Sequence, residues 1–431
     1  MLAAMLSRFL AFLRTWVLGA ALVAGGCALA WHFVAPPPPA VVRIGTGPEG
    51  SAYREVAEAW AAALEREGLA VALRPTDGAV ENLALLRGNE VDLAPVQGGL
   101  VLAERDAGLV SLGGIFNEPA WVFVRRGAGL RNPMRVAGHK VALGPEGSGT
   151  RALALALLAA NGVAPGSFEA LPLAGLAAAE ALLAGEVDVA FFVATRPGPA
   201  ISLLLREPGQ AELVNFATRA AAYAVRLPFL SPVVLPRAGF SLADDLPAQP
   251  ATMLAAQAFL AAREDVNPQL AALLVRVLQA THRGRQLFAA EGTYPNALNQ
   301  ELPVHPAARQ AYEHGPSQLH QWLSFRWAVA VERLWVFAIP LVTLFLPLLR
   351  FAPPVYAWQM RMRVWRGYDR LRRVEREAAG KADAAARGAL LEQLDTLEAQ
   401  VSRMGVPSGY AALVYAMRRD IDYVRQRLTN P

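Results

Sequence analysis

Two long uncharged segments stand out in the hydrophobic pattern of the chain. Residues 15–35 carry no formal charge over 21 positions, close to the ~20 residues with which a helix crosses a bilayer. The uncharged run 334–349 is shorter, at 16 residues. Flanking apolar residues extend this run to a span over 327–351. The guanidinium of Arg350 can reach the membrane–water interface. We expect a transmembrane helix in each segment.

Between these segments the chain repeats itself. The sequence Gly-Pro-Glu-Gly-Ser occurs at 47–51 and again at 144–148, an offset of 97 residues. Ala-Leu-Leu followed by a glycine occurs at 84–88 and, at the same offset, at 181–185. Two blocks in the same order at one offset indicate that the middle of the chain holds two related copies of one unit.

Each copy predicts the same succession of elements. A short apolar strand leads into the Gly-Pro-Glu-Gly-Ser loop, an Ala-rich helix follows, a further helix ends at a glycine, and a buried strand comes last. The expected strands are 41–45, 91–96, 140–143 and 187–193, and the helices after the two loops are 53–67 and 151–161. Alternating strands and helices predict a mainly parallel α/β sheet in each copy, and we expect two lobes that close around a ligand.

Helical periodicity returns near the C-terminus. Apolar residues recur every three or four positions, at Leu390, Leu394, Leu397, Val401, Met404 and, after a break at 405–407, at Val414, Met417, Ile421, Val424 and Leu428. Such seams are typical of helices that pack side by side. We therefore expect a helical hairpin over 352–431.

The distribution of charge gives the predicted topology. The whole chain has a net charge of +5, but residues 36–326 carry 23 basic and 26 acidic side chains, whereas residues 350–431 carry 15 and 9. Arginines flank both apolar segments on the side away from the middle, as the positive-inside rule requires of cytoplasmic flanks. We expect a bacterial inner-membrane protein whose residues 36–326 lie in the periplasm and whose termini, 1–14 and 352–431, are cytoplasmic. Because the basic excess lies at the membrane flanks, it does not indicate a nucleic-acid partner.

The fate of the first apolar segment stays open at this point. It is a retained signal-anchor, or a signal peptide cleaved after Ala30, or a lipoprotein signal with Cys27 as the lipid-modified residue. Each of the three exports the residues that follow. Cys27 is the only cysteine, which excludes an internal disulfide framework.

Catalytic signatures are missing from the sequence. The second glycine loop continues as Gly149-Thr150-Arg151 and lacks the lysine of a nucleotide-binding loop. Ser148 has Glu146 two residues before it, so the loop is no Gly-x-Ser-x-Gly nucleophile elbow. The histidines are scattered without metal-ligand spacing. We expect no enzyme, no metal and no cofactor.

Glycine loops that open helices are suited to bind anions, because backbone N–H groups and the positive end of the helix dipole point at the ligand. The alternative is that the glycines only permit tight turns and that Ser51 and Ser148 cap their helices. The sequence alone leaves both interpretations open.

Several motifs resemble those of the TAXI-type solute receptors, the substrate-binding subunits of one class of tripartite ATP-independent periplasmic (TRAP) transporters. The matching segments are 44–47, 78–83, 91–97 and 147–150. The resemblance covers about residues 41–300 and implies a type II periplasmic-binding-protein fold. It also implies uptake of small organic acids or amino acids, driven by an ion gradient, through TRAP membrane subunits.

The resemblance also implies a set of cleft residues. Mapped onto this sequence, they are Ser51, Tyr53, Glu81, Asn82, Gln97, Ser148, Gly149 and Thr150. Arg54 and Arg151, each one residue into its helix, are candidate clamps for a carboxylate. The expected crossovers between lobes, 121–124 and 253–262, divide the domain into lobe 1 (41–120 and 258–325) and lobe 2 (121–257).

We therefore expect a membrane-anchored periplasmic solute receptor that hands its ligand to transporter subunits. The alternative is a sensor that reports ligand binding through the second span to the cytoplasmic hairpin. Neighbouring genes would separate the two, since permease genes favour transport.

Overall fold

The computed structural model describes residues 21, 24–25, 27–28, 39–130, 132–298, 300–315, 325–378 and 384–429. Their contacts divide the chain into two compact units, residues 32–333 and residues 1–31 with 334–431, which are described separately.

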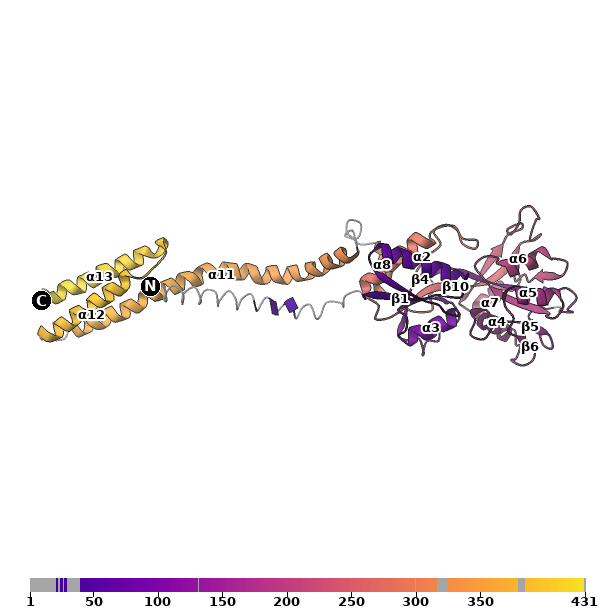
Figure 1. Ribbon diagram of the computed structural model, residues 1–431, viewed down its shortest axis with the longest axis horizontal. Helices are drawn as coiled ribbons and strands as arrows, with labels where there is room; N and C mark the ends of the chain where they lie inside the picture. Colours follow the sequence, from indigo (N-terminus) through magenta and orange to yellow (C-terminus); the bar gives the residue numbers. More distant parts are fainter. Residues whose placement is uncertain are drawn as a thin grey trace. The chain divides into compact units, whose positions relative to one another are not determined.

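The unit of residues 32–333 is built on a single sheet of ten strands (Figure 1). The strands are β1 (Val41–Gly45), β2 (Ala70–Arg74), β3 (Leu93–Gln97), β4 (Leu109–Arg125), β5 (Lys140–Ala142), β6 (Glu169–Leu171), β7 (Val189–Val193), β8 (Ala211–Leu213), β9 (Leu230–Leu235) and β10 (Ala251–Arg263). The strand order is β2-β1-β3-β10-β4-β7-β5-β6, with β8 beside β4 and β9 beside β10.

Helices cover both faces of this sheet. They are α2 (Ala52–Arg66), α3 (Ala79–Arg87), α4 (Gly149–Ala160), α5 (Gly175–Leu183), α6 (Pro199–Arg206), α7 (Ala220–Arg226), α8 (Pro268–His282) and α9 (Pro306–His314). In lobe 1, α2 and α8 lie on one face and α3 on the other (Figure 1). In lobe 2, α4 and α7 share one apolar cluster, and α5 and α6 share the cluster on the opposite face.

Two long strands run through both lobes and join them. In lobe 1, β10 pairs antiparallel with β3 through residues 258–262, and in lobe 2 it pairs with β9 through residues 251–256. Residues 120–124 of β4 pair with β7 of lobe 2. β4 also pairs antiparallel with β10 and β8, whereas the pairings β1–β2, β1–β3, β5–β6 and β5–β7 are parallel. The predicted α/β architecture is confirmed: helices cover both faces of the sheet, and its two ends have separate apolar cores.

The duplicated blocks have the local structure that the repeat predicts. In both copies a short strand, β1 or β5, leads through the Gly-Pro-Glu-Gly-Ser loop into a helix, α2 or α4. In each loop the glycine before the serine, Gly50 or Gly147, has a positive φ of 73° or 77°, a backbone conformation that other residues seldom adopt.

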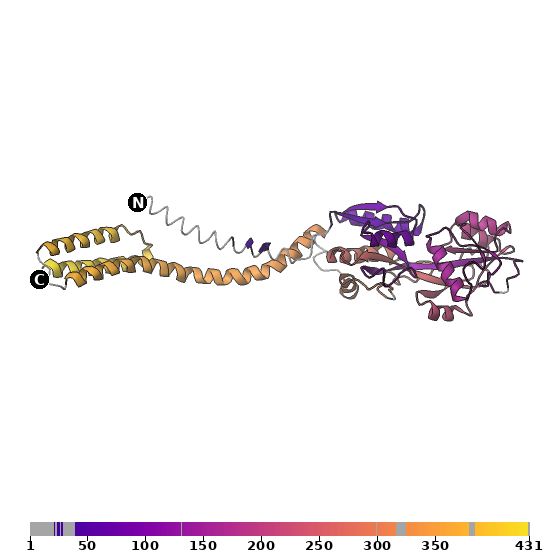
Figure 2. The same cartoon turned by 90° about the horizontal axis from the view of Figure 1, so that it is seen from below.

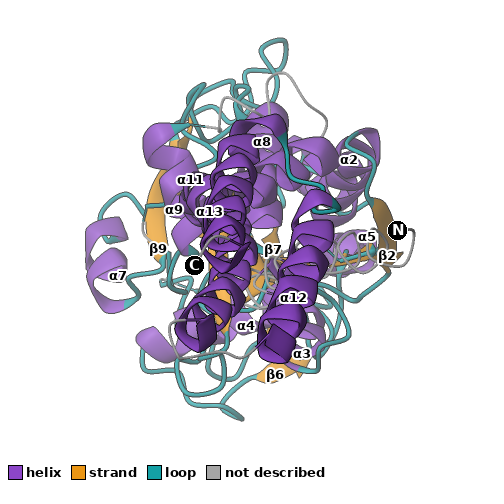
Figure 3. Cartoon of the chain, turned by 90° about the vertical axis from the view of Figure 1, so that its left-hand side faces the viewer, coloured by secondary structure: helices purple, strands orange, loops and turns teal. Residues whose placement is uncertain are grey.

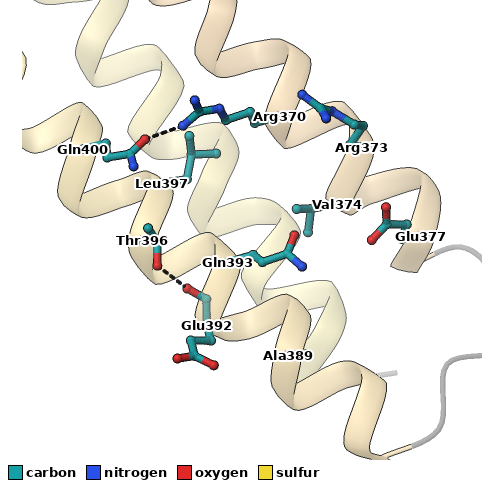
Figure 4. A pocket seen from close by; sticks show the side chains of 10 residues that line it. All are labelled: Arg370, Arg373, Val374, Glu377, Ala389, Glu392, Gln393, Thr396, Leu397 and Gln400. Atoms are coloured by element: carbon teal, nitrogen blue, oxygen red, sulfur yellow. Dashed lines mark hydrogen bonds between the residues drawn. The ribbon is translucent and has the colours of Figure 1, made fainter.

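Helix α11 (Phe325–Ala378) begins in the unit of residues 32–333, and the other unit contains its residues from 334 onward together with α12 (Ala384–Ser402) and α13 (Ala411–Thr429). The seams predicted for 390–401 and 417–428 are buried, but they pack with a third helix, because Val364, Leu371 and Val374 of α11 belong to the same core. In place of the expected two-helix hairpin, the C-terminal part of α11 packs with α12 and α13 around one apolar core (Figures 2 and 3). Figure 4 shows a groove between α11 and α12, where Arg370 Nη1 donates a hydrogen bond to Gln400 Oε1 at 2.6 Å.

Within the part of the chain that the structure describes, no helix combines the length and apolar character needed to cross a membrane. Most of the first expected span, 15–35, lies outside the described residues. In the second, 327–351, the backbone is part of α11, and most side chains from 332 onward lie outside the described set.

Candidate functional site

The carboxyl ends of parallel strands from both lobes approach the lobe boundary, which is where sheets of this kind bind ligands. β1 and β3 end there in lobe 1 at Gly45 and Gln97. β5 and β7 end there in lobe 2. The first glycine loop (residues 46–51) and the second glycine loop (residues 143–148) follow β1 and β5.

The serines of the two glycine loops have nearly identical surroundings. Ser51 Oγ accepts a hydrogen bond from the backbone N–H of Arg54 at 3.3 Å, and Ser148 Oγ accepts one from the N–H of Arg151 at 3.2 Å. Each hydroxyl also donates to the carbonyl of its loop proline, at 2.7 and 2.9 Å. Both serines therefore cap their helices, as the structural interpretation of the loops expects.

Gln97 and Gly149 meet across the boundary between the lobes. Gln97 Nε2 donates to the carbonyl oxygen of Gly149 at 3.3 Å. A Cβ atom at position 149 would lie 2.0 Å from Gln97 Oε1, so a larger residue there would require the Gln97 side chain to turn away. Thr150, the next residue of α4, is only partly buried.

A second contact joins the lobes near the surface. Arg196, which follows β7 in lobe 2, donates from Nη2 to both carboxylate oxygens of Glu55 in α2 at 2.7 Å. Both side chains are at least half exposed, so the pair contributes little net stability but marks where the lobes touch.

Asn82 and Glu81 are engaged inside lobe 1. Asn82 is fully buried, and its Nδ2 donates to the carbonyls of Thr46 and Pro95 at 2.8 and 2.9 Å. Its Oδ1 accepts a hydrogen bond from Thr76 Oγ1 at 2.9 Å. Glu81 accepts from the backbone N–H of Asp77. The structure thus places Asn82 where it joins the segments after β1 and β2 to strand β3, and not on the wall of an open cleft.

The two candidate arginine clamps have partners close in sequence. Arg54 Nε donates to Glu58 Oε1 at 2.5 Å, one turn along α2. Arg151 Nη1 donates to the carbonyl of Gly144 in the second glycine loop at 3.3 Å. Both remain partly exposed at the first turn of their helices.

The most unusual polar group at the boundary is Glu118, which the sequence analysis did not single out. It lies in β4, is 7% exposed, and accepts a hydrogen bond from the hydroxyl of Tyr53 at 2.7 Å. Burial raises the pKa of Glu118 to about 7, against a smaller lowering by the Tyr53 hydrogen bond. Burial, and then the charge of Glu118, raise the pKa of Tyr53. A lone acidic residue within a long apolar strand was the signal in the sequence that could have revealed it.

A buried histidine lies behind this pair. His282 Nε2 accepts a hydrogen bond from Trp60 Nε1 at 3.1 Å, and its ring packs against Phe116, which in turn lies beside Tyr53. Burial lowers the pKa of His282 to about 4, so this imidazole is neutral and serves as an acceptor. No group of three or more potential ligands that could hold a metal ion occurs among the described residues.

Solved structures with similar folds include several binding proteins. The alkanesulfonate-binding protein SsuA from Xanthomonas axonopodis pv. citri, bound to MOPS, is 18% identical, with a TM-score of 0.36; the alignment covers 57% of this chain and 74% of that one. The aliphatic sulphonate-binding protein SsuA from Escherichia coli is 17% identical, with a TM-score of 0.36 and coverage of 56% and 72%. An ancestral arginine-binding protein bound to glutamine is 15% identical, with a TM-score of 0.35 and coverage of 57% and 94%.

The comparison with protein families gives a more specific result. The matched residues, 44–315, include both lobes, both glycine loops and the two long strands that join the lobes. Because the match extends over more than half of the sequence, the chain belongs to the NMT1-like family.

Proposed function

We propose that the chain is a solute-binding receptor of the TAXI type, which closes its two lobes on a small polar ligand and delivers it to TRAP transporter membrane subunits. The observation that carries the proposal is the approach of Gln97 to Gly149, which brings the end of a lobe 1 strand to the first turn of a lobe 2 helix. Two lobes that are joined by two strands can separate and close again by bending of these strands.

The TAXI assignment is supported by the sequence motifs at 44–47, 78–83, 91–97 and 147–150. All four lie within the residues that match the NMT1-like family. The similar structures include proteins that bind alkanesulfonates and arginine or glutamine, which agrees with a small, polar and charged ligand.

We also propose that the receptor is anchored in the bacterial inner membrane, with its binding domain in the periplasm and both termini in the cytoplasm. The support is the pair of uncharged segments, 15–35 and 334–349, with arginines on their outer flanks.

Transport can be tested directly. Cells that lack the chain should lose uptake of the ligand found by a thermal-shift screen of the purified full-length protein against amino acids, organic acids and alkanesulfonates. Uptake restored by the wild-type chain should stop when an ionophore collapses the ion gradient, and it should persist when ATP synthesis is blocked under a maintained gradient. Uptake that follows ATP and ignores the ionophore would contradict delivery to TRAP subunits.

A sensor is the second candidate, and one feature of α11 favours it. The same helix contributes Phe325 and Val329 to the core of lobe 1 and Val364 to the core of the C-terminal helices. Normal uptake in the deletion strain, together with a ligand response in gene expression that depends on residues 384–429, would favour the sensor over the receptor.

A further inference from the structure

Glu118 occupies the boundary between the lobes by strand register. Glu118 of β4 pairs with Ala256 of β10. On its N-terminal side, β4 residues 109–116 pair with β10 residues 258–263 in lobe 1. On its C-terminal side, β4 begins to pair with β7 of lobe 2 at residue 120. On β10, the partner strand changes from β9 to β3 between Ala256 and Ala258. Glu118 therefore lies where both connecting strands pass from one lobe to the other.

Alternation along β4 identifies the face on which Glu118 lies. Side chains two residues apart point to the same face of a strand. Phe116 packs into the lobe 1 core with α2 and α8, and Ala120 and Val122 pack into the lobe 2 core with α4. Glu118 is the member of this row between the two cores, on the face that carries α2 and α4, the helices opened by the two glycine loops.

Among the residues that the structure describes, none supplies a counter-charge to the carboxyl group of Glu118. Its hydrogen-bond partner is the neutral hydroxyl of Tyr53, in the first turn of α2. No ion pair among the described residues includes Glu118, although the side chain is more than nine-tenths buried. Burying a carboxylate without a cation is costly, and its cross-strand neighbour, Ala256, is small and cannot supply one.

The helix N-termini on this face of the sheet are positively polarised, in contrast to the Glu118 carboxylate. The N-termini of α2 and α4 carry the positive ends of their helix dipoles, and backbone N–H groups there favour an anionic ligand group. A ligand that satisfies both features has a negative group for the glycine loops and a positive group for Glu118. An amino acid has both, whereas an organic acid or a sulfonate without an amine leaves the carboxylate unpaired.

We propose that Glu118, held by Tyr53, binds the ammonium group of the ligand and makes the cleft selective for amino acids over the corresponding acids without an amine. This inference rests on the receptor function proposed above and names the ligand class of that same site.

The test compares matched pairs of compounds on the full-length protein in detergent. The pairs are L-glutamate and glutarate, L-aspartate and succinate, and L-leucine and 4-methylpentanoate. We expect one or more amino acids to raise the melting temperature and to bind at least about 30-fold more tightly than the amine-free partner, because only the amino acid brings an ammonium group to pair with the Glu118 carboxylate. Equal or tighter binding of an amine-free acid would overturn the inference and leave the receptor function intact. If only an amine-free compound of the thermal-shift screen, such as an alkanesulfonate, binds, the inference is overturned and the receptor function stands; if no compound of that screen binds, the receptor function itself is contradicted.

Two variants and one control variant assign the selectivity to this residue. Glu118→Gln keeps the size of the side chain and removes its charge. It should lower the affinity for the amino acid at least about 30-fold and abolish the difference in affinity between the amino acid and its amine-free partner. Glu169→Gln is the matched control, since it removes the same charge from an exposed position at the amino end of β6, outside both glycine loops, and should bind normally. Tyr53→Phe, which leaves Glu118 without its hydroxyl partner, should weaken binding of the amino acid more than binding of the acid. Unchanged selectivity in Glu118→Gln would overturn the inference.

Discussion

Glu118 makes the stability of the chain depend on pH. Its pKa in the folded state is about 7, above the usual 4.5 of a glutamic acid, because burial disfavours the charged form. The folded state therefore binds the proton more tightly than the unfolded state does. The contribution of Glu118 to the free energy of unfolding is greatest below pH 4.5 and is lost as the pH rises through 7, by about 3 kcal/mol in all.

The isosteric variant Glu118→Gln isolates this effect. Without ligand, we expect the wild-type free energy of unfolding to fall relative to that of the variant between pH 4.5 and pH 8. His282 acts in the opposite direction, since its lowered pKa of about 4 costs stability as the pH falls below 6.5, but it does so in both proteins and cancels in the difference. Urea unfolding, followed by tryptophan fluorescence, measures both curves; Trp60 and Trp121 are fully buried in this domain. Parallel curves would show that Glu118 is not buried as a titrating acid.

Single residues also show where sequence reasoning stops. The helix-capping roles of Ser51 and Ser148 follow from local sequence, because the capping bond spans three residues. The role of Asn82 does not, because its partners Thr46 and Pro95 lie 36 and 13 residues away and meet only when the strands pair. The contact of Tyr53 with Glu118, 65 residues apart, is of the same kind.

At the scale of elements, the hydrophobic pattern within one segment predicts the strand–loop–helix units. It does not predict which other elements pair or pack with them. The strands β1 and β5 and the helices α2 and α4 appear where the repeat places them, because each is encoded within one segment. The length of β4 was not foreseen, since a 17-residue strand that serves two lobes mixes apolar residues with Gly113, Gly114 and Pro119. Likewise, the seams of α12 and α13 predict a pair of helices, and the third helix of that core comes from α11.

The first turn of α4 should control closure of the lobes. Gly149→Val places a branched side chain where even a Cβ would overlap Gln97 Oε1, so Gln97 must turn away before the lobes can meet as they do here. We expect the variant to fold normally and to bind the best compound of the thermal-shift screen at least about tenfold more weakly, since closure contributes to binding. Isothermal titration calorimetry measures this difference.

The double variant Gln97→Ala/Gly149→Val is the control for this prediction. Removing the Gln97 side chain makes room for valine, so we expect the double variant to bind more tightly than Gly149→Val alone. A coupling free energy near zero between the two substitutions would mean that Gln97 and Gly149 do not meet in the ligand-bound state.

At the scale of the whole molecule, the arrangement of charged and apolar segments predicts a membrane topology. The fold of residues 32–333 does not by itself determine this topology. Residues 36–326 are slightly acidic and residues 350–431 are basic, with the uncharged run 334–349 between them. This run falls within α11, a helix of 54 residues, whereas ~20 residues suffice to cross a bilayer. One continuous helix thus has the length to span a membrane and still to pack with α12 and α13.

Reporter fusions in the bacterial cell test this topology. A reporter that is active only in the periplasm should be active when fused after Glu313, at the end of α9, and inactive when fused after Asp369, in the C-terminal part of α11. The physical reason is the cluster of arginines that follows residue 360, which resists translocation across the inner membrane. Activity in both fusions would show that α11 does not cross the membrane, and it would leave the C-terminal helices in the periplasm. Inactivity in both would show that the binding domain is not exported, and it would contradict a periplasmic receptor of any kind. Only activity after Glu313 with inactivity after Asp369 agrees with a receptor whose C-terminal helices lie in the cytoplasm.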